Sequence, residues 1–263
     1  MAGFDAQLRA RYAALGAEQQ GLRFAVFEQA LTGFLNLRRQ GKVPAEQQRL
    51  AVIDFDLPSS EKRFWVLDLA ANRVLYRSLV AHGNNSGQLE ATQFSNLNGS
   101  NASSLGFYVT GSEYVGKHGR SLRLNGLDPG FNDQAAARAI VVHGADYVSE
   151  AFIKQTGRLG RSQGCPALPL ELFAPIIDTL KGEPACSCTN PGPATRRPTS
   201  TRRWPVRLGG AFPRPWLTGG TPSVFQRRAV SAAPGGCTRQ RSCLPPLTHS
   251  HSAGTTAGPR QTG

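Results

Sequence analysis

The stretch AVIDFDLPSSEKRFWVLDL at residues 51–69 decides the fold class. From Leu50 the apolar residues recur at every second position, and a Pro-Ser-Ser turn separates this run from a second β-rich run at 64–69. Another turn precedes a third run at 74–80. Three short runs of this kind, with turn residues between them, are typical of an antiparallel meander. We therefore expect three neighbouring antiparallel strands in this region.

Further β-rich runs follow a long loop. Residues 83–106 are rich in Gly, Asn and Ser and predict a loop, whereas LGFYVTG (105–111) and SLRLNGL (121–127) predict two strands. A short apolar run at 139–142 predicts a buried strand that ends at His143. Many strands with few helices between them indicate a mainly β domain.

Apolar residues at helical spacing predict helices on both sides of the β-rich region. Two helices are expected near the N-terminus, within residues 5–16 and 24–41, as a layer packed on the main domain. Short helices are predicted from Asp133, over 147–155 and over 170–180. These would be the few short helices that cross the strands.

The net charge of +13 is concentrated near the C-terminus. After Glu183 the sequence has no Asp, Glu or Lys but 11 arginines, which leaves a formal charge of +2 for residues 1–183. Residues 184–263 are dominated by Pro, Gly, Ser, Thr, Ala and Arg. This composition buries too little apolar area to offset the entropy of ordering. We therefore divide the chain into an N-terminal helical segment (1–45), a main domain (46–183) and a disordered basic tail (184–263).

More than one interpretation of residues 184–263 stays open. Arginine without lysine or carboxylate is what a GC-rich gene yields when it is translated in a shifted frame. A genuine basic linker, or an arm for nucleic acid or an anionic polymer, would have the same composition. The few aromatic residues there belong to no recognisable folded module, so we expect no nucleic-acid partner.

Nothing in the sequence indicates a transmembrane segment, a disulfide framework or a metal site. It has no apolar run long enough to span a bilayer as a helix. Four of the five cysteines lie after Glu183, so they do not form the pattern of a small disulfide-rich domain. Cys186 and Cys188 form a C-x-C pair without a second ligand pair at zinc spacing. We expect neither a metal nor a cofactor.

Two short blocks carry the candidate chemistry. VVHG (141–144) ends an apolar run with a histidine, and GRSQGCP (160–166) places Cys165 after a glycine in a polar loop. No other cysteine precedes Cys186 in the sequence. A cysteine thiolate is a nucleophile, and a neighbouring imidazole can activate it. Taken alone, a single cysteine is often a packed hydrophobic residue.

The two blocks resemble the active-site motif of the L,D-transpeptidases, the YkuD-type family that remodels bacterial peptidoglycan. Residues 143–144 fill its His-Gly positions, and residues 162–165 fill Ser/Thr-His-Gly-Cys with Gln163 in place of the second histidine. Ala167 stands where many members have an arginine. The resemblance spans roughly residues 20–183 and includes the 51–69 stretch. This form of the motif, with glutamine before Gly-Cys and proline after it, is similar to the divergent branch called murein L,D-transpeptidase catalytic domain proteins.

The resemblance implies an antiparallel β sandwich or barrel-like catalytic domain that transfers acyl groups. In this family a cysteine attacks the carbonyl that joins the third residue of a peptidoglycan stem peptide to D-alanine. D-alanine leaves, a thioester forms, and an amine of a second stem peptide takes the acyl group. Stem peptides would be the partners, and carbapenem β-lactams the inhibitors.

The resemblance also implies a periplasmic or cell-envelope location. The N-terminal stretch MAGFDAQLRARYAALGAEQQ has no signal-peptide pattern, because polar and charged residues interrupt each apolar run. A truncated start and a lost export signal are both open explanations.

By the same resemblance, Cys165 would be the nucleophile and His143 the base. The backbone N–H groups of Gly164 and Cys165 would stabilise the oxyanion, and a glycine permits the close approach or positive φ that such a loop needs. Ser162 is expected to brace the loop through hydrogen bonds. Gln163 is able to hold a substrate but not to titrate. The residues expected to contact the substrate are Gly144, Arg158, Arg161, Ser162 and Gln163.

Two other functions stay open. A cell-wall cysteine carboxypeptidase or amidase would use the same cysteine and histidine with water as the acceptor, although in papain-like enzymes the cysteine precedes the histidine. A catalytically weak peptidoglycan-binding domain would keep the cleft and make Cys165 incidental. His82 is either a cleft residue or a turn histidine, and Tyr108 and Tyr114 belong to the core or the cleft wall.

Overall fold

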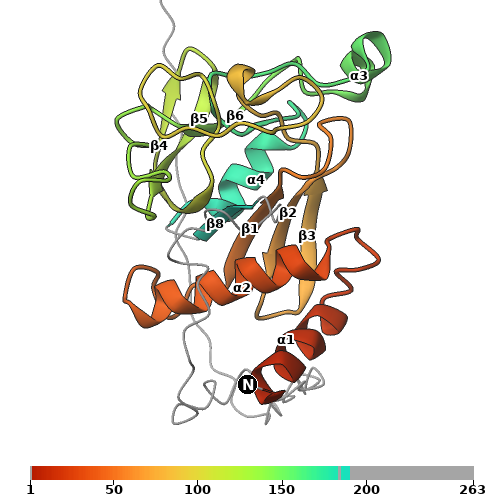
Figure 1. Cartoon of the computed structure of the whole chain (residues 1–263), viewed down its shortest axis with the longest axis vertical. Coiled ribbons are helices and arrows are strands. Elements are labelled where there is room, and N and C mark those ends of the chain that lie inside the picture. Colours follow the sequence, from red (N-terminus) through yellow and green to blue (C-terminus); the bar gives the residue numbers. More distant parts are fainter. Residues whose placement is uncertain (1, 183–184, 190–263) are drawn as a thin grey trace, which may run out of the picture. The chain divides into compact units, whose positions relative to one another are not determined.

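The residues that the structure describes, 2–182 and 185–189, contain eight strands in one mixed sheet (Figure 1). The structure is a computed structural model. The chain divides into two units, Met1–Leu217 and Thr218–Gly263, and every described residue lies in the first. The strand order is β3-β2-β1-β8-β4-β5-β6-β7, in which β1 with β8 and β6 with β7 are parallel and the other pairs antiparallel. The strands are β1 Arg49–Asp54, β2 Phe64–Asp68, β3 Arg73–Ser78, β4 Gly106–Gly116, β5 Gly119–Gly126, β6 Val141–Gly144, β7 Ala167–Leu168 and β8 Ala185–Thr189.

The predicted meander is confirmed by β1, β2 and β3, which pair antiparallel in sequence order. Because successive side chains of a strand point to opposite faces, β1 contributes to two cores. Ala51 and Ile53 join one hydrophobic core, and Leu50 and Val52 join another on the opposite face. The sheet is therefore buried on both sides at this point.

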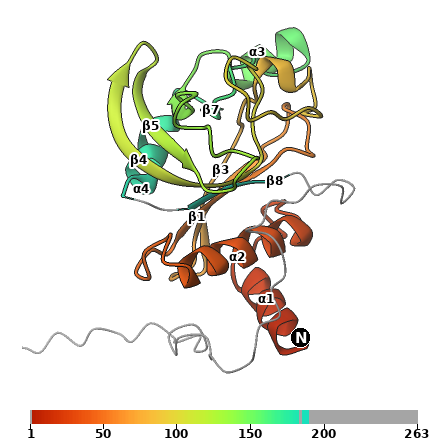
Figure 2. The same cartoon turned by 60° about the vertical axis from the view of Figure 1, so that its left-hand side comes forward.

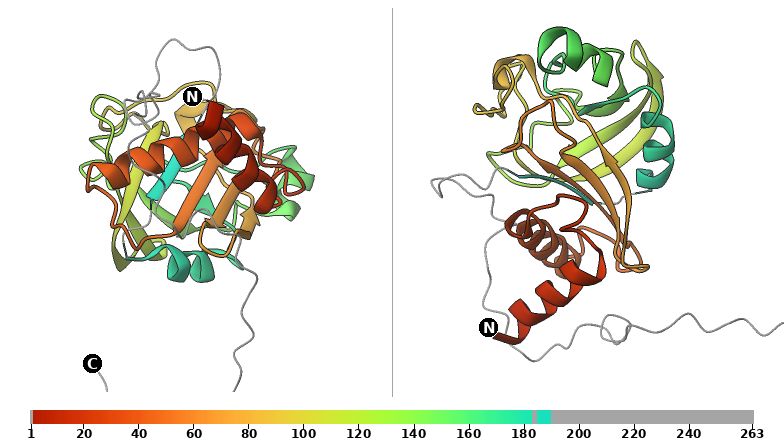
Figure 3. Two further views of the ribbon diagram at one scale, coloured as in Figure 1. Left: turned by 90° about the horizontal axis from the view of Figure 1, so that it is seen from below. Right: turned by 90° about the vertical axis from the view of Figure 1, so that its right-hand side faces the viewer.

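Two N-terminal helices, α1 (Ala2–Ala14) and α2 (Phe24–Arg39), cover one face of the sheet (Figures 1 and 3). Their apolar residues share a core with Trp65 of β2 and Phe107 of β4. The contact is close, because a Cβ added to Gly33 of α2 would lie 2.2 Å from the Phe107 ring. The predicted helical layer packed on the main domain is confirmed.

The opposite face holds α4 (Phe173–Leu180), and α3 (Glu150–Thr156) lies beyond the end of the sheet. Ile176, Ile177 and Leu180 of α4 pack in the same core as Ala51 and Ile53. Strands β4 and β5 extend beyond the predicted runs and form a long curved hairpin (Figure 2). Its tip lies beside β6, because the His118 ring stacks on the ring of His143.

The helix predicted from Asp133 is wrong, because residues 129–139 form turns. Its backbone bonds do not keep one helical period, because Ala135 N–H donates to Asn132 C=O (2.8 Å) three residues back and Arg138 N–H to Gln134 C=O (2.9 Å) four residues back. Side chains also bond the backbone near the start of the segment. The Asp133 carboxylate accepts from Gly130 N–H (2.8 Å), and the Asn132 side-chain oxygen accepts from Asp128 N–H (2.9 Å). Ala139 ends the segment in a left-handed conformation with φ +54°.

The predicted disorder does not extend to residues 185–189, which form a strand. Strand β8 lies between β1 and β4 in the middle of the sheet, within the range assigned to the tail. Its backbone pairs with both neighbours, and this pairing does not depend on the composition of the segment. Residues 190–263 lie outside the described residues, and so do the predictions of disorder and of a shifted reading frame. The three-part division of the chain stays a prediction.

The mainly β class is confirmed, with a mixed sheet that is not a closed barrel. Strands β3 and β7 are its two edges. The chain beyond β3 nevertheless approaches β7, because Ala81 N–H donates to Ala167 C=O (2.9 Å) and Ser162 N–H donates to His82 C=O (3.0 Å). These bonds fix the segment at 81–84 beside the loop that carries Cys165.

Candidate active site

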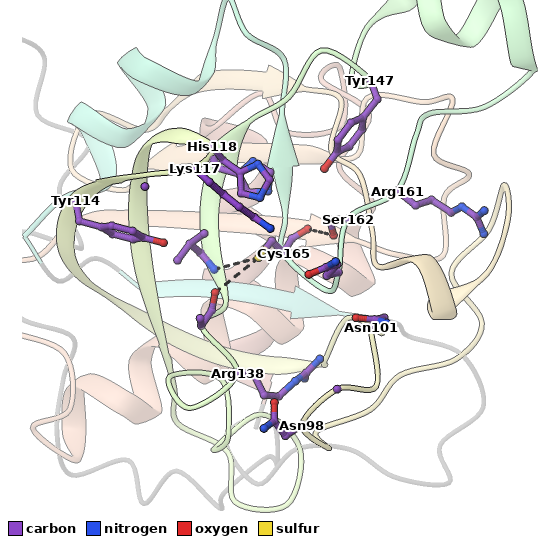
Figure 4. A pocket seen from close by; sticks show the side chains of 16 residues that line it. Asn98, Asn101, Tyr114, Lys117, His118, Arg138, Tyr147, Arg161, Ser162 and Cys165 are labelled. Atoms are coloured by element: carbon purple, nitrogen blue, oxygen red, sulfur yellow. Dashed lines mark hydrogen bonds between the residues drawn. The ribbon is translucent and has the colours of Figure 1, made fainter.

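A cavity of about 530 Å³ lies where β6, the cysteine loop (residues 160–166) and the tip of the β4–β5 hairpin meet (Figure 4). Of the eight residues predicted for the site, the structure brings five together along this cavity: His143, Arg161, Ser162, Gln163 and Cys165. The other three, Gly144, Arg158 and Gly164, do not line it.

Ser162 braces the cysteine loop. Its hydroxyl donates to the backbone carbonyl of Cys165 (2.6 Å) and accepts from the backbone N–H of Gly164 (3.1 Å). Gly164 has φ +116°, and a Cβ there would lie 2.8 Å from the carbonyl oxygen of Ala102. Side chains rarely adopt this backbone conformation, so the turn requires glycine. The loop conformation follows from these two residues.

The Cys165 thiol lies half-buried against β6. Its Sγ accepts from Val141 N–H (3.5 Å) and lies 3.9 Å from the carbonyl oxygen of Ala139, to which the thiol donates (Figure 4). Burial raises the pKa of the thiol, and the Val141 bond and the charges of Arg138 and Lys117 oppose that rise. The net direction is upward, so the resting group is a thiol rather than a thiolate.

His143 lies at the buried end of β6, with one ring nitrogen fixed. Its Nδ1 is 2.9 Å from the carbonyl oxygen of Gly144, an acceptor, so Nδ1 carries the proton and Nε2 keeps a free lone pair. Burial lowers the pKa of His143, the bond to Gly144 raises it, and the charge of His118 lowers it further. A neutral imidazole with an available Nε2 is the form that accepts a proton.

The thiol and the imidazole line the same cavity but are not hydrogen-bonded to each other. Within the described residues, the partners of Cys165 Sγ are the backbone groups of Val141 and Ala139. The raised pKa of the thiol and the lowered pKa of the imidazole favour the neutral form of both groups at rest.

The backbone donors near the thiol differ from the expected pair. The Gly164 N–H is already bonded to the Ser162 hydroxyl. No described residue accepts a hydrogen bond from the Cys165 N–H. Of the two groups, the Cys165 N–H is the one that remains available for an oxyanion.

Two predicted substrate contacts are placed away from the cavity. Gly144 is buried against the Phe173 ring of α4, and its carbonyl orients His143. Arg158 donates to the neighbouring Leu159 carbonyl (2.7 Å). In this structure the Gly144 carbonyl orients the His143 ring.

Sequence reasoning missed the residues at the rim of the cavity. Lys117 and His118 form the turn of the β4–β5 hairpin, and the His118 ring stacks on His143 with centroids 4.5 Å apart. Tyr147 lines another wall, and burial first, then the charges of Cys165 and Asp146, raise its pKa to about 12. The signal for the hairpin pair was a Gly-Lys-His-Gly run between two predicted strands, which places titratable side chains at a tight turn.

Arg138 and the asparagines of the 83–106 loop were also missed. Arg138 holds the loop through its guanidinium, which donates to the carbonyls of Ser95 (2.7 Å) and Ala102 (2.5 Å) and lies within 3.2–3.3 Å of the hydroxyls of Ser100 and Ser104. Asn98 and Asn101 of the same loop line the cavity. The arginine stood in a predicted helix, where nothing distinguished it from a surface residue.

His82 is a buried histidine outside the cavity. Its Nδ1 accepts from the Arg63 guanidinium (2.7 Å), and its Nε2 donates to Gly87 C=O (3.2 Å). Burial, then the Arg63 charge, lower the pKa of His82 to about 4, and burial lowers that of Arg63 to about 9. Tyr108 is a core residue bonded to Ser104, and Tyr114 lines the cavity.

The described residues hold no cluster of three or more His, Cys, Asp or Glu side chains able to bind a metal ion. None of the helices in the described part of the chain is long and apolar enough to cross a membrane.

Comparisons with known proteins agree with the resemblance noted from the sequence. A family model described as L,D-transpeptidase catalytic domain matches residues 18–186. A search of curated proteins finds no match.

Solved structures also match. An L,D-transpeptidase from Mycobacterium smegmatis is 14% identical, with 54% of this chain and 59% of that chain covered and a TM-score of 0.35. An LD transpeptidase in complex with imipenem is 13% identical, with the same coverage and a TM-score of 0.34. An L,D-transpeptidase from Xylanimonas cellulosilytica is 13% identical, with 62% and 80% covered and a TM-score of 0.31. The chain thus spans 59% of the first two of these proteins.

Proposed function

Because the chain belongs to the L,D-transpeptidase catalytic domain family, we propose that it is a peptidoglycan L,D-transpeptidase with Cys165 as its nucleophile. The acyl donor is a stem tetrapeptide, the leaving group is D-alanine, and the acceptor is an amine. The site of action is the cell envelope, where peptidoglycan lies.

One observation carries the proposal. Cys165 and His143 come from separate elements, a polar loop and the end of β6, and both line one cavity. The Nδ1 proton of His143 is committed to the Gly144 carbonyl, which leaves Nε2 as the atom that accepts a proton. A half-buried thiol that shares a cavity with an imidazole of this tautomer suits nucleophilic catalysis by cysteine.

In the first half-reaction the thiol attacks the carbonyl between the third residue and D-alanine. A carbon–sulfur bond forms while His143 Nε2 takes the thiol proton, and the Cys165 N–H donates to the carbonyl oxygen as it gains negative charge. The carbon–nitrogen bond then breaks, and the imidazolium returns the proton to the leaving amine. The products are free D-alanine and a thioester on Cys165.

The second half-reaction runs in the reverse sense with a new amine. The amine attacks the thioester carbonyl and gives its proton to His143, and the carbon–sulfur bond breaks. The thiolate that leaves recovers the proton from the imidazolium. The amide product carries the acyl group on the acceptor.

The remaining predicted residues support these steps in different ways. Ser162 holds the loop, and Gln163 and Arg161 line the same cavity and are proposed substrate contacts. Arg158 is a proposed contact for parts of the stem peptide that extend beyond the cavity. Gly144 contributes through the orientation of His143.

Water is the alternative acceptor. With water in place of the amine, the same thioester would be hydrolysed and the protein would act as a carboxypeptidase. The cavity that Cys165 and His143 share supports either reaction. A carbapenem also presents a strained carbonyl to the thiol, so we propose that this class of β-lactam acylates Cys165.

The test is D-alanine release from a stem tetrapeptide by the purified full chain. We expect release that depends on Cys165, with a cross-linked dimer formed when a second stem peptide is present and a tripeptide formed when water is the acceptor. Mass spectrometry distinguishes the two products. No release by the parent protein, or equal release by Cys165→Ala, would contradict the proposal.

A further inference from the structure

The cavity carries a positive charge that nothing along its described lining offsets. Its lining includes Lys117, Arg138 and Arg161, whereas no Asp or Glu lines it. A cleft lined by one sign of charge concentrates ligands of the opposite sign. An anionic group is therefore the ligand that this electrostatic environment favours.

Two of the three cations already have partners. The Arg138 guanidinium donates to carbonyl oxygens and hydroxyls of the 83–106 loop. Arg161 donates to the carbonyls of Asn84 (3.1 Å) and Gly87 (3.2 Å) in the same loop. Both side chains shape the wall of the cavity.

Lys117 differs from the two arginines. It lies exposed at the tip of the β4–β5 hairpin, and no described residue forms an ion pair or hydrogen bond with its ammonium group. Figure 4 shows this group pointing toward Cys165. The Lys117 charge also acts on the thiol, because it opposes the rise in the Cys165 pKa that burial causes.

We propose that Lys117 binds a carboxylate of the acyl donor beside the carbonyl that Cys165 attacks, and thereby selects donors that carry one. The inference rests on the proposed function. In a stem tetrapeptide this carboxylate belongs either to the terminal D-alanine or to the side chain of the third residue. The two sources share one chemistry, and substitution of each in turn distinguishes them.

A lysine at a hairpin tip suits this role. Its ammonium group has three donors on a flexible stem, so it follows a carboxylate without the fixed planar geometry that a guanidinium imposes. Because Lys117 is exposed, substitution of its side chain leaves the buried core intact.

Binding is measured by isothermal titration calorimetry on the full chain with Cys165→Ala, so that no chemistry follows. The probes are a tetrapeptide with both carboxylates, its C-terminal amide, and the peptide with a carboxamide on the third side chain. We expect Lys117→Met to raise the Kd of the first probe about tenfold, equivalent to about 1.4 kcal/mol. The Kd of the probe that lacks the recognised carboxylate should not change, and Lys117→Arg should restore part of the affinity.

The matched control is Lys154→Met, which removes an exposed lysine of α3 that does not line the cavity. It should leave every Kd unchanged. The inference is overturned if Lys117→Met weakens all three probes equally, if it weakens none, or if the parent background does not bind the first probe. Acylation by a carbapenem is measured in a separate experiment on the protein that retains Cys165. A failure of the proposed function is thereby distinguished from a failure of the Lys117 proposal.

Discussion

The floor and the rim of the cavity are built in different ways. The floor consists of His143 at the end of β6 and the cysteine loop, whose polar atoms are held by backbone and serine hydrogen bonds. The rim is the hairpin turn of Lys117 and His118, which are exposed and contribute charge and a stacked ring. The floor fixes the proposed nucleophile and base, and the charges of the rim act on the pKa of both groups. Substitutions in the floor should therefore change rates far more than those in the rim.

The two stacked histidines make the sharpest test of this difference. His143→Ala should slow acylation by a carbapenem by about 10²-fold or more, because it removes the proposed base. His118→Ala should cost much less, because His118 acts on His143 only through a stacked ring and a nearby charge. Stopped-flow or mass-resolved acylation rates measure both. Equal losses in the two variants would remove the distinction between floor and rim.

Ser162→Ala should have the next largest effect. The variant leaves the Gly164 N–H without its acceptor and releases the Cys165 carbonyl, so the nucleophile is less well positioned. We expect an acylation rate about tenfold lower, because small displacements of a nucleophile are costly. The unfolding free energy should fall by about 1–2 kcal/mol.

The control for Ser162 is Ser78→Ala. Ser78 is also buried and donates to a backbone carbonyl (Leu79, 2.9 Å), but it lies in β3 away from the cavity. The Ser78→Ala substitution should lower the melting temperature without changing the acylation rate. A rate loss in Ser78→Ala equal to that in Ser162→Ala would mean that general destabilisation explains both.

The pKa of the Cys165 thiol tests whether Cys165 and His143 are both neutral in the absence of substrate. Burial raises this pKa, so alkylation by iodoacetamide should increase with pH along a curve whose midpoint lies above the ordinary cysteine value of about 8.5. A midpoint well below this value would show a thiolate–imidazolium pair already formed at rest.

The smallest expected effect concerns how the rate of acylation by a carbapenem depends on pH. It is a shift of the acidic limb of that pH–rate profile. The rate should rise with pH as His143 loses its proton, with an apparent pKa below the ordinary value of about 6.5, because burial and the His118 charge both lower it. His118→Phe keeps a stacked ring without the charge and should move this limb to higher pH by about half a unit. An unchanged or downward-shifted limb would contradict the role assigned to the His118 charge.

Much of the floor could be predicted from the sequence, because it consists of local patterns. The apolar run that ends at His143 and the Gly-Cys-Pro turn both express backbone preferences of neighbouring residues. The rim could not be predicted in the same way. Contact between His118 and His143 depends on the length and curvature of the β4–β5 hairpin. The strands predicted from the sequence were shorter than β4 and β5, and their curvature was not predicted.

Strand β8 shows the same limit in the fold. ACSCT is short, lacks large apolar residues and precedes a Pro- and Arg-rich segment, so composition argued against a strand. Its place depends on backbone pairing with β1 and β4, partners that lie far from it in the sequence. Arg138 was missed for a similar reason, because its role depends on a loop that lies well before it in the chain.

The most direct test of the central claim is peptide mapping by mass spectrometry after the full chain is exposed to a carbapenem. We expect one covalent adduct, located on Cys165, and no adduct in Cys165→Ala. The other four cysteines provide internal controls, because they lie outside the cysteine loop. A parent protein without an adduct on Cys165, or acylation that persists in Cys165→Ala, would contradict the assignment of Cys165 as the nucleophile.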